Sequence, residues 1–269
     1  MSEPNALKPA LASPQPPVIV VENLTARFGD NTIFEKVSFQ VHKGEILVIL
    51  GGSGCGKSTL LKHMIGLNRP YAGRVLVNGI DANTKIDKEL HKLQRGIGVL
   101  FQSGALFGSM TLADNIALPL QEYTDLSPAT IELVVKMKLG LVQLSGYENH
   151  LPEEISGGMK KRAGLARAMA LDPHVLFFDE PSAGLDPITS AELDILINNI
   201  NAGMGTTMVI VTHELESIFN IAHRVVMLDK SAKGKIAEGD PRVLKDTSTD
   251  PRVINFFHRR PPALKEKQV

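Results

Sequence analysis

Short apolar runs alternate with longer segments of helical periodicity along most of the chain. Runs rich in β-branched and other apolar residues, which favour strands, cover residues 18–28, 38–50, 73–79, 174–180, 206–213 and 223–229. We expect turns at Lys43-Gly44 and at Asn78-Gly79. Amphipathic segments such as Ser190 to Asn201 separate the later runs. This alternation predicts an α/β fold with a mostly parallel sheet that helices cover on both faces.

The middle and the two ends of the chain depart from this alternation. Strand-like runs are absent between Ser109 and Ala170, so we interpret this segment as a helical subdomain inserted into the α/β core. The first 17 residues contain five prolines but no apolar region of the kind that a signal peptide has. We therefore expect a flexible leader at 1–17, an ordered domain at 18–245 with its helical insertion at about 109–170, and a C-terminal extension at 246–269.

Charge and cysteine content exclude several classes of protein. Lys plus Arg and Asp plus Glu number 29 each among 269 residues, so the net charge of zero gives no support for nucleic-acid binding. A single cysteine, Cys55, rules out an intramolecular disulfide. The charge-free stretches Gly96 to Ala113 and Ile195 to Thr212 hold too many polar residues for a membrane-spanning helix.

The segment LGGSGCGKST carries the strongest chemical signal. Gly51, Gly56, Lys57 and Ser58 fill the pattern G-x-x-x-x-G-K-[ST] between a buried strand and an amphipathic segment, the context that a phosphate-binding P-loop requires. Backbone amides would hold the phosphates, the lysine would pair with the β- and γ-phosphates, and the serine hydroxyl would bind Mg²⁺. We expect nucleotide contacts from Gly51, Gly52, Ser53, Gly54, Cys55, Gly56, Lys57, Ser58 and Thr59.

Two features near this signal need separate interpretation. Cys55 is either a passive small residue of the loop or a reactive thiol at a helix N-terminus, in which case a thiol reagent should block nucleotide binding. In the run HVLFFDEP, Asp179 ends a strand and can reach the magnesium ion. Glu180, one residue further on, can polarise the attacking water, and general-base help of this kind contributes about 10² to 10⁴ in rate.

The segment EISGGMKKRAGLARAMA lies between these two motifs and resembles the signature of the ATP-binding-cassette (ABC) superfamily, L-S-G-G-Q before a helix. Here Ile155 replaces leucine and Met159 replaces glutamine. The other family elements each occur once and in family order. They are an adenine-stacking aromatic at Phe28, a Q-loop at Gln102, a D-loop from Ser182 to Asp186, and a switch histidine at His213.

The resemblance implies a P-loop NTPase (RecA-like) core with a mostly parallel sheet, an antiparallel β subdomain and an inserted α-helical subdomain. It implies Glu180, His213 and Gln102 as catalytic residues, and Ser58, Gln102 and Asp179 around Mg²⁺. ATP would lie between the P-loop of one copy and the signature of a second copy. The resemblance therefore adds further nucleotide contacts, namely Phe28, Ser156, Gly157, Gly158 and Asp186. The residues alone leave open a core aromatic at Phe28, an ordinary loop amide at Gln102 and a core histidine at His213.

Two details narrow the resemblance to the ATPase subunits of MCE-associated lipid transporters, above all the maintenance-of-lipid-asymmetry (Mla) system of Gram-negative bacteria. The first is LFQSGALF together with SGGM. The second is the tail, where DPRV at Asp240 and Asp250 predicts two helices, each with an aspartate N-cap and proline at its first position. The second tail helix either packs on its own subunit or, as in the family, reaches the neighbouring cassette.

The resemblance also implies partners, a location and a cargo. The partners are a second copy of the chain, a membrane permease dimer, a periplasmic MCE-domain lipid-binding protein and a small cytoplasmic STAS-domain protein. The chain would lie at the cytoplasmic face of the bacterial inner membrane and drive phospholipid movement between the inner and outer membranes. The alternatives are an importer ATPase for another small solute and a soluble ABC ATPase. The apolar positions that either line a permease groove or pack the core are Leu100, Phe101, Leu106, Phe107 and Met110.

Overall fold

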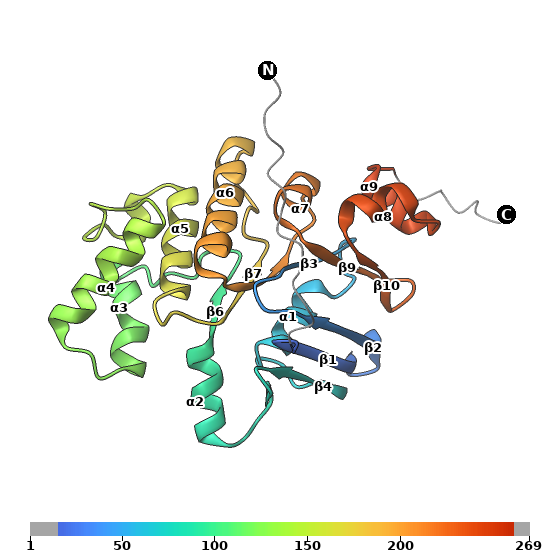
Figure 1. Ribbon diagram of the computed structural model, residues 1–269, viewed down its shortest axis with the longest axis horizontal. Helices are drawn as coiled ribbons and strands as arrows, with labels where there is room; N and C mark the ends of the chain where they lie inside the picture. The colour runs from blue at the N-terminus through green and yellow to red at the C-terminus, as the bar shows by residue number, and fades with distance from the viewer. Residues whose placement is uncertain (1–15, 261–269) are drawn as a thin grey trace.

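A six-stranded sheet forms the centre of the computed structural model, which describes residues 16–260 (Figure 1). Its strand order is β10-β9-β3-β8-β7-β6, and every neighbouring pair is parallel except β9 with β10. The prediction of a mostly parallel sheet is therefore confirmed. The strands are β3 (Ile46–Gly51), β6 (Ile97–Leu100), β7 (Val175–Asp179), β8 (Thr207–Val211), β9 (Arg224–Asp229) and β10 (Gly234–Gly239).

The central strands have apolar side chains on both faces because each face packs against a different core. Every residue of β3 and β8 is buried. Ile46 and Val48 belong to the core shared with the helical segment and α6 (Pro187–Met204), whereas Leu47 and Ile49 belong to the core around α1 (Lys57–Met64) and the second sheet. Alternation of side chains along one strand thus joins two cores into one domain.

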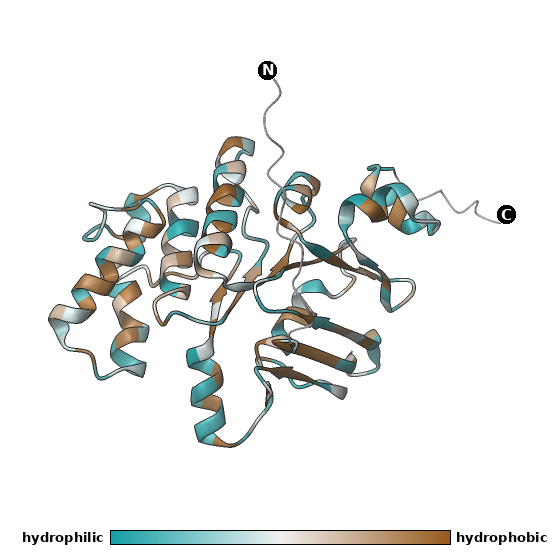
Figure 2. Cartoon of the chain, viewed as in Figure 1, coloured by the Kyte–Doolittle hydropathy of each residue, from teal (hydrophilic) through white to brown (hydrophobic). Residues whose placement is uncertain are grey.

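The second sheet has the order β2-β1-β4-β5, and all its pairs are antiparallel. The predicted turn at Asn78-Gly79 is confirmed, since both residues have positive φ, 50° and 77°, between the last two strands. In Figure 2 the strands of both sheets are largely apolar. The four strands are β1 (Ile19–Phe28), β2 (Asn31–Val41), β4 (Ala72–Val77) and β5 (Ile80–Asp81).

Helices dominate between Ser109 and Ala170, as the sequence pattern predicts. They are α3 (Leu112–Tyr123), α4 (Pro128–Leu141), the 3₁₀ turn η1 (Pro152–Glu154) and α5 (Gly157–Ala168). A separate polar helix, α2 (Asp87–Gly96), leads into β6. Within residues 16–260, no helix has the length and apolar character needed to cross a bilayer.

The C-terminal helices pack on their own chain. After α7 (Leu215–Ile221), the predicted aspartate caps begin α8 (Pro241–Thr247) and α9 (Pro251–Phe257), where Asp240 and Asp250 accept hydrogen bonds from backbone amides two residues on. Phe257 of α9 is buried with its ring centroid 5.8 Å from that of Phe219 on α7. The predicted leader, apart from its last two residues, and residues 261–269 of the extension lie outside the described residues.

Candidate nucleotide site

A cavity of about 790 Å³ opens at the carboxyl edge of the parallel sheet. The loops that follow β3, β6, β7 and β8 all reach this edge, the usual place for ligand sites in open α/β sheets. The residues that line the cavity are Ile33, Gly51, Gly52, Ser53, Gly54, Gly56, Lys57, Ser58, Thr59, Gln102, Glu180, His213 and Phe256. Segments distant in sequence therefore meet at one place.

Glycine is required at two positions of the loop after β3. A Cβ at Gly51 would lie 2.2 Å from the carbonyl oxygen of Leu228, and a Cβ at Gly56 would lie 2.7 Å from a methyl carbon of Ile33. Both residues also have positive φ, 146° and 100°, which side chains disfavour. The loop can therefore follow this path only with glycine at these positions.

The first turn of α1 presents backbone N–H groups that its own chain does not cap. The N-cap is Gly56, which has no side chain to accept a hydrogen bond from the helix amides. Free amides and the positive end of the helix dipole together favour phosphate oxygens. The ammonium of Lys57 lies at the same loop, where it donates to the carbonyl of Gly51 at 3.0 Å. The arrangement suits the phosphate chain of a nucleotide.

Ser58 and Asp179 provide a pair of oxygen atoms where the start of α1 meets the end of β7. The Ser58 hydroxyl donates to Asp179 Oδ1 at 2.8 Å, which joins the start of α1 to the end of β7. A hydroxyl and a carboxylate are hard oxygen ligands, and Mg²⁺ commonly binds through one or two such groups together with substrate phosphates. The residues present therefore fit a magnesium ion that a nucleotide shares.

Glu180 and His213 form the polar wall of the cavity. Nδ1 of His213 lies 3.0 Å and 2.9 Å from the two carboxylate oxygens of Glu180. The backbone of Glu180 is left-handed, with φ of 49°, and its N–H donates to the carbonyl of Val211 at 2.8 Å. A left-handed conformation in a residue other than glycine costs about 1–3 kcal/mol. Neighbouring structure thus holds the backbone of Glu180 in a strained conformation at the cavity that the P-loop also lines.

Several predicted residues lie away from the cavity walls. Phe28 ends β1 with 54% of its surface exposed and is absent from the lining residues, whereas Ile33 of β2 is present among them. Cys55 is buried, and burial raises the pKa of its thiol, so the structure favours the passive interpretation of this residue. Asp186 caps α6, and hydrogen bonds from Thr189 lower the pKa of its carboxyl.

The signature segment is exposed at Ser156 and Gly157, and none of its residues lines the cavity. Ser156 is the N-cap of α5 and accepts a hydrogen bond from the backbone N–H of Met159 at 3.3 Å. Ser156 and Gly157 are exposed, while Gly158 is buried against Thr189. A hydroxyl and glycine amides at a helix start can bind an anion, and here Ser156 and Gly157 are accessible from outside the chain.

Comparison with known proteins identifies the family. The sequence pattern of the ABC transporter family matches residues 34–183, more than half of the chain. The chain belongs to the ABC transporter family. It is an ABC-type ATPase, and its P-loop core with both sheets and the helical insertion is the fold of that family. The dimeric ATP-binding cassette MJ0796, bound to ADP and phosphate, superimposes with a TM-score of 0.74 at 27% identity, over 82% of this chain and 98% of that one.

Two groups of relatives in sequence carry different names. A probable ribonucleotide transport ATP-binding protein, mkl of Mycobacterium leprae, is 46% identical over 242 residues, which make up 90% of this chain and 69% of that protein. The intermembrane phospholipid transport system ATP-binding protein MlaF of Haemophilus influenzae is 41% identical over 241 residues, or 89% of this chain and 90% of that protein. MlaF of Escherichia coli is 40% identical over 230 residues, or 85% and 84% of the two chains.

A mostly apolar groove of about 610 Å³ lies between β6, α3 and α5 of this ABC ATPase. The apolar cluster from the sequence divides here. Phe101 and Phe107 line the groove, whereas Leu100 is buried in the core and Leu106 packs against it. Met110, the fifth member, is half-buried and is not among the lining residues.

Helix α5 approaches the loop after β6 closely along one side of the groove. A Cβ at Gly164 would lie 2.8 Å from Leu100 and 2.9 Å from the carbonyl oxygen of Gly104. One turn further on, the guanidinium of Arg167 donates to the carbonyls of Gly104 and Ala105. The helix and the loop are therefore in direct contact, without an intervening layer of side chains.

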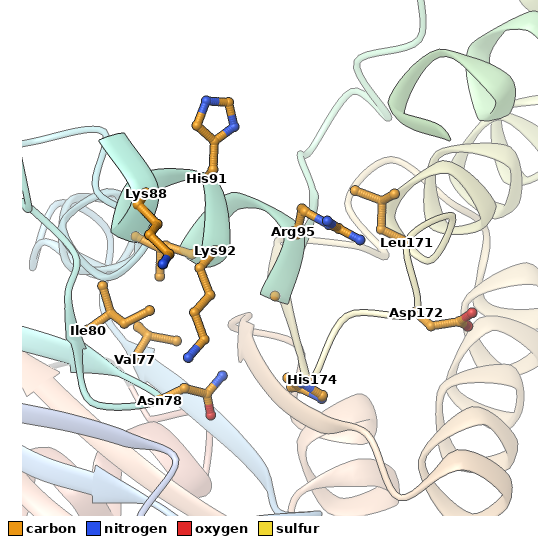
Figure 3. Close-up of a pocket in the computed structure, with 12 residues that line it drawn as sticks. Val77, Asn78, Ile80, Lys88, His91, Lys92, Arg95, Leu171, Asp172 and His174 are labelled. Atoms are coloured by element: carbon orange, nitrogen blue, oxygen red, sulfur yellow. The ribbon is translucent and has the colours of Figure 1, made fainter. Parts of the chain in front are cut away.

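A second cavity, of about 820 Å³, lies apart from the nucleotide site, and several basic residues are among those that line it (Figure 3). Lys88, Lys92 and Arg95 of α2 line it, and they take part in none of the ion pairs within residues 16–260. The carboxylate of Asp172, on the opposite wall, is paired with Lys138. In Figure 3 the Lys92 side chain extends from α2 toward Asn78.

Two lining residues of the nucleotide cavity, Ile33 and Phe256, were not predicted. Ile33 lies early in β2, in a stretch whose polar neighbours hide the strand pattern. Phe256 comes from α9, near the far end of the chain, and also borders a smaller cavity beside α7. The sequence shows that both side chains are apolar, but only the tertiary fold brings them to the P-loop.

Proposed function

We propose that this chain is the ATP-hydrolysing motor subunit of an ABC transporter that moves phospholipids between the inner and outer membranes of a Gram-negative bacterium. The chain would be peripheral at the cytoplasmic face of the inner membrane. Its partners would be a second copy of itself, a membrane permease dimer, a periplasmic MCE-domain lipid-binding protein and a small cytoplasmic STAS-domain protein.

The observation that carries the ATPase cycle is the separation of the two nucleotide-binding elements within one chain. Lys57 and Glu180 line one cavity, while Ser156 is exposed at the start of α5. Two chains related by a twofold axis would each add a signature to the other's P-loop, a closed arrangement typical of soluble oligomers. The solved cassette MJ0796, which resembles this chain, is dimeric. ATP would favour the closed dimer because its γ-phosphate adds contacts only there.

The residues around the cavity can divide the chemistry of hydrolysis among them. Glu180 would accept a proton from the attacking water, and His213, in contact with both carboxylate oxygens, would orient it and contact the γ-phosphate. Lys57 and the amides of α1 would hold the phosphate chain. Ser58, Asp179 and Gln102 would hold Mg²⁺, which neutralises phosphate charge when it is bound. Phe28 would contact the nucleotide from the rim of the cavity, and Asp186 would contact it across the dimer.

Two observations support a transporter of phospholipid. The identity of about 40% to MlaF proteins extends over most of both chains. The apolar groove beside α5 is lined by the half-buried Phe101 and the exposed Phe107, as a surface that receives a helix of a permease would be. The rival within transport is a solute transporter, which the 46% identity to mkl favours. The rival outside transport is a soluble ABC ATPase.

Purification of the complete native complex distinguishes these functions. The tagged chain would be isolated from its host in mild detergent, its partners identified by mass spectrometry, and bound lipid extracted and analysed. A permease together with an MCE-domain protein and phospholipid is the expected result. A permease with another periplasmic receptor would overturn the cargo and keep the motor. Ribosomal or DNA-associated partners without any membrane protein would overturn transport.

A further inference from the structure

Lys161 is one of two lysines that are buried within residues 16–260, and its surroundings differ from those of the other. Lys138, on α4, forms an ion pair with the carboxylate of Asp172. The ammonium of Lys161, on α5, donates instead to backbone carbonyls, those of Gln102 and, at 3.5 Å, Glu180. Burial of a cation without a paired anion is costly, so this position calls for an explanation.

The electrostatic surroundings of Lys161 reflect this cost. Burial lowers the pKa of its ammonium, and the carboxylates of Asp179, Glu180 and Glu214 oppose that change. These acidic groups lie at the carboxyl edge of the sheet, so the cation is held close to the catalytic face without forming an ion pair there. The remaining attraction acts through the two carbonyl dipoles, whose positions the ammonium can fix.

Both carbonyls belong to residues whose side chains line the nucleotide cavity. Gln102 is the second residue of the loop after β6, and Glu180 follows β7 in a left-handed conformation that needs support from its surroundings. A single ammonium therefore sets the distance between the two loops that present these side chains. No P-loop residue accepts a hydrogen bond from Lys161 among the described contacts.

The same lysine lies on the helix that begins with the signature. Ser156 caps α5, and Lys161 is about one and a half turns further along it. We propose that Lys161 is a positioning residue that links engagement of the signature by the other subunit's ATP to the placement of Gln102 and Glu180 in its own subunit. This inference rests on the proposed roles of those two residues and is independent of the transported cargo.

Three substitutions in the full chain, purified as the native complex, test this role. Lys161→Met keeps the length and the apolar stem but removes the ammonium, and kcat for ATP hydrolysis should fall about 10- to 100-fold, since small misplacement of a catalytic group has effects of this size. KM for ATP should stay within about twofold, because the contacts with the nucleotide are left intact. Lys161→Arg restores donors and charge, and it should recover most of kcat.

Lys138→Met is the matched control, because it removes a buried ammonium of similar exposure from the same helical segment. We expect it to lower the melting temperature at least as much as Lys161→Met while kcat stays near that of the unmodified chain. If Lys161→Met fails to fold, Lys161→Gln keeps a neutral donor and should show a reduced kcat at unchanged KM. The inference is overturned if the folded Lys161 variant keeps the unmodified kcat, or if its kcat falls no more than that of Lys138→Met.

This outcome can be separated from failure of the proposed cargo or of the catalytic assignment. Recovery of partners other than a lipid permease would change the cargo and leave the Lys161 kinetics as they are. If Glu180→Gln hydrolyses ATP normally, the catalytic assignment fails, and a fall of kcat in Lys161→Met would then need another cause. A defect confined to Lys161→Met, with normal hydrolysis in Glu180→Gln, would therefore also count against the inference.

Discussion

The two helix starts that the ABC family uses for ATP differ in how their backbone amides are satisfied. Helix α1 begins at Gly56 with no side-chain cap, whereas α5 begins at Ser156, whose hydroxyl already accepts the amide of Met159. The first start lies inside a cavity among catalytic side chains, and the second is exposed. The start of α1 therefore leaves its backbone amides free for a ligand held by its own chain. The start of α5 is already capped by Ser156, so its ligand would come from another subunit.

Substitution of Glu180 by glutamine is expected to give the largest effect and tests the P-loop side of this comparison. Glutamine keeps the shape and a contact to His213 but loses proton-accepting power, so turnover should drop by about 10² to 10⁴. Steady-state hydrolysis and size-exclusion chromatography with ATP would show slow turnover together with accumulated dimer. Glu216→Gln, on an exposed side chain, is the control. Normal hydrolysis by Glu180→Gln would remove Glu180 from the role of base.

Phe257→Ala asks whether the C-terminal helix supports the P-loop side. Phe257 is only 4% exposed, and truncation of a buried phenylalanine costs about 3–5 kcal/mol of unfolding free energy. We expect native-state hydrogen exchange to quicken in α7 and α9 more than in α5, because Phe257 packs against Phe219. Val243→Ala, at an exposed position of α8, should change little. Equal quickening in α5 would show that the two sides are not separable.

Ser156→Ala sharpens the signature side. Loss of the cap should cost about 1 kcal/mol of stability, and loss of a hydroxyl that meets the other subunit's nucleotide should lower turnover about tenfold. ATP binding measured on the isolated chain should stay the same. The matched control is Ser127→Ala, which removes the equivalent cap of α4 and should cost similar stability without a loss of turnover. Unchanged turnover in Ser156→Ala would contradict the dimeric site.

Labelling of Cys55 is the smallest expected effect and tests how closed the P-loop is. The thiol reacts as the thiolate, and burial raises its pKa, so the folded chain should label more slowly than the unfolded chain at every pH. The midpoint of the rate against pH should move upward, because a higher pH is needed to deprotonate the folded thiol. This shift would be seen in the rates of labelling with a maleimide between pH 7 and 10, measured for the folded chain in buffer and for the unfolded chain in guanidinium. A midpoint below that of the unfolded chain would support a reactive thiol.

Much of the fold is predictable from local pattern, and the exceptions have identifiable causes. The parallel strands β7, β8 and β9 are short apolar runs, which sequence alone marks clearly. Strand β6 was not predicted, because Gly98 interrupts its run; in the structure a Cβ at this position would lie 2.1 Å from the carbonyl oxygen of Ala168. The strand is thus defined by its close approach to α5, which no local pattern reports.

The candidate site divides in the same way. Motif spacing predicts the P-loop and the adjacent pair Asp179 and Glu180, because their roles require fixed neighbours along the chain, whereas His213 follows only from the resemblance to the ABC family. Lys161 reads in the sequence as one more polar residue of a helix, and its burial becomes visible only when α5 is placed against the loops after β6 and β7. Phe256 likewise depends on the position of α9. The contacts between segments that are distant in the chain cannot be predicted from local sequence pattern.

The tight seating of Gly164 and Arg167 on the loop after β6 has a mechanical consequence. Helix α5 has 12 residues, so its two ends are about 18 Å apart. A helix of this length that packs directly against a loop can neither bend nor slide along it without breaking these contacts. If the signature end of this helix rotates, the other end would therefore be displaced with it, and that end carries Arg167 and Ala168, which line the apolar groove.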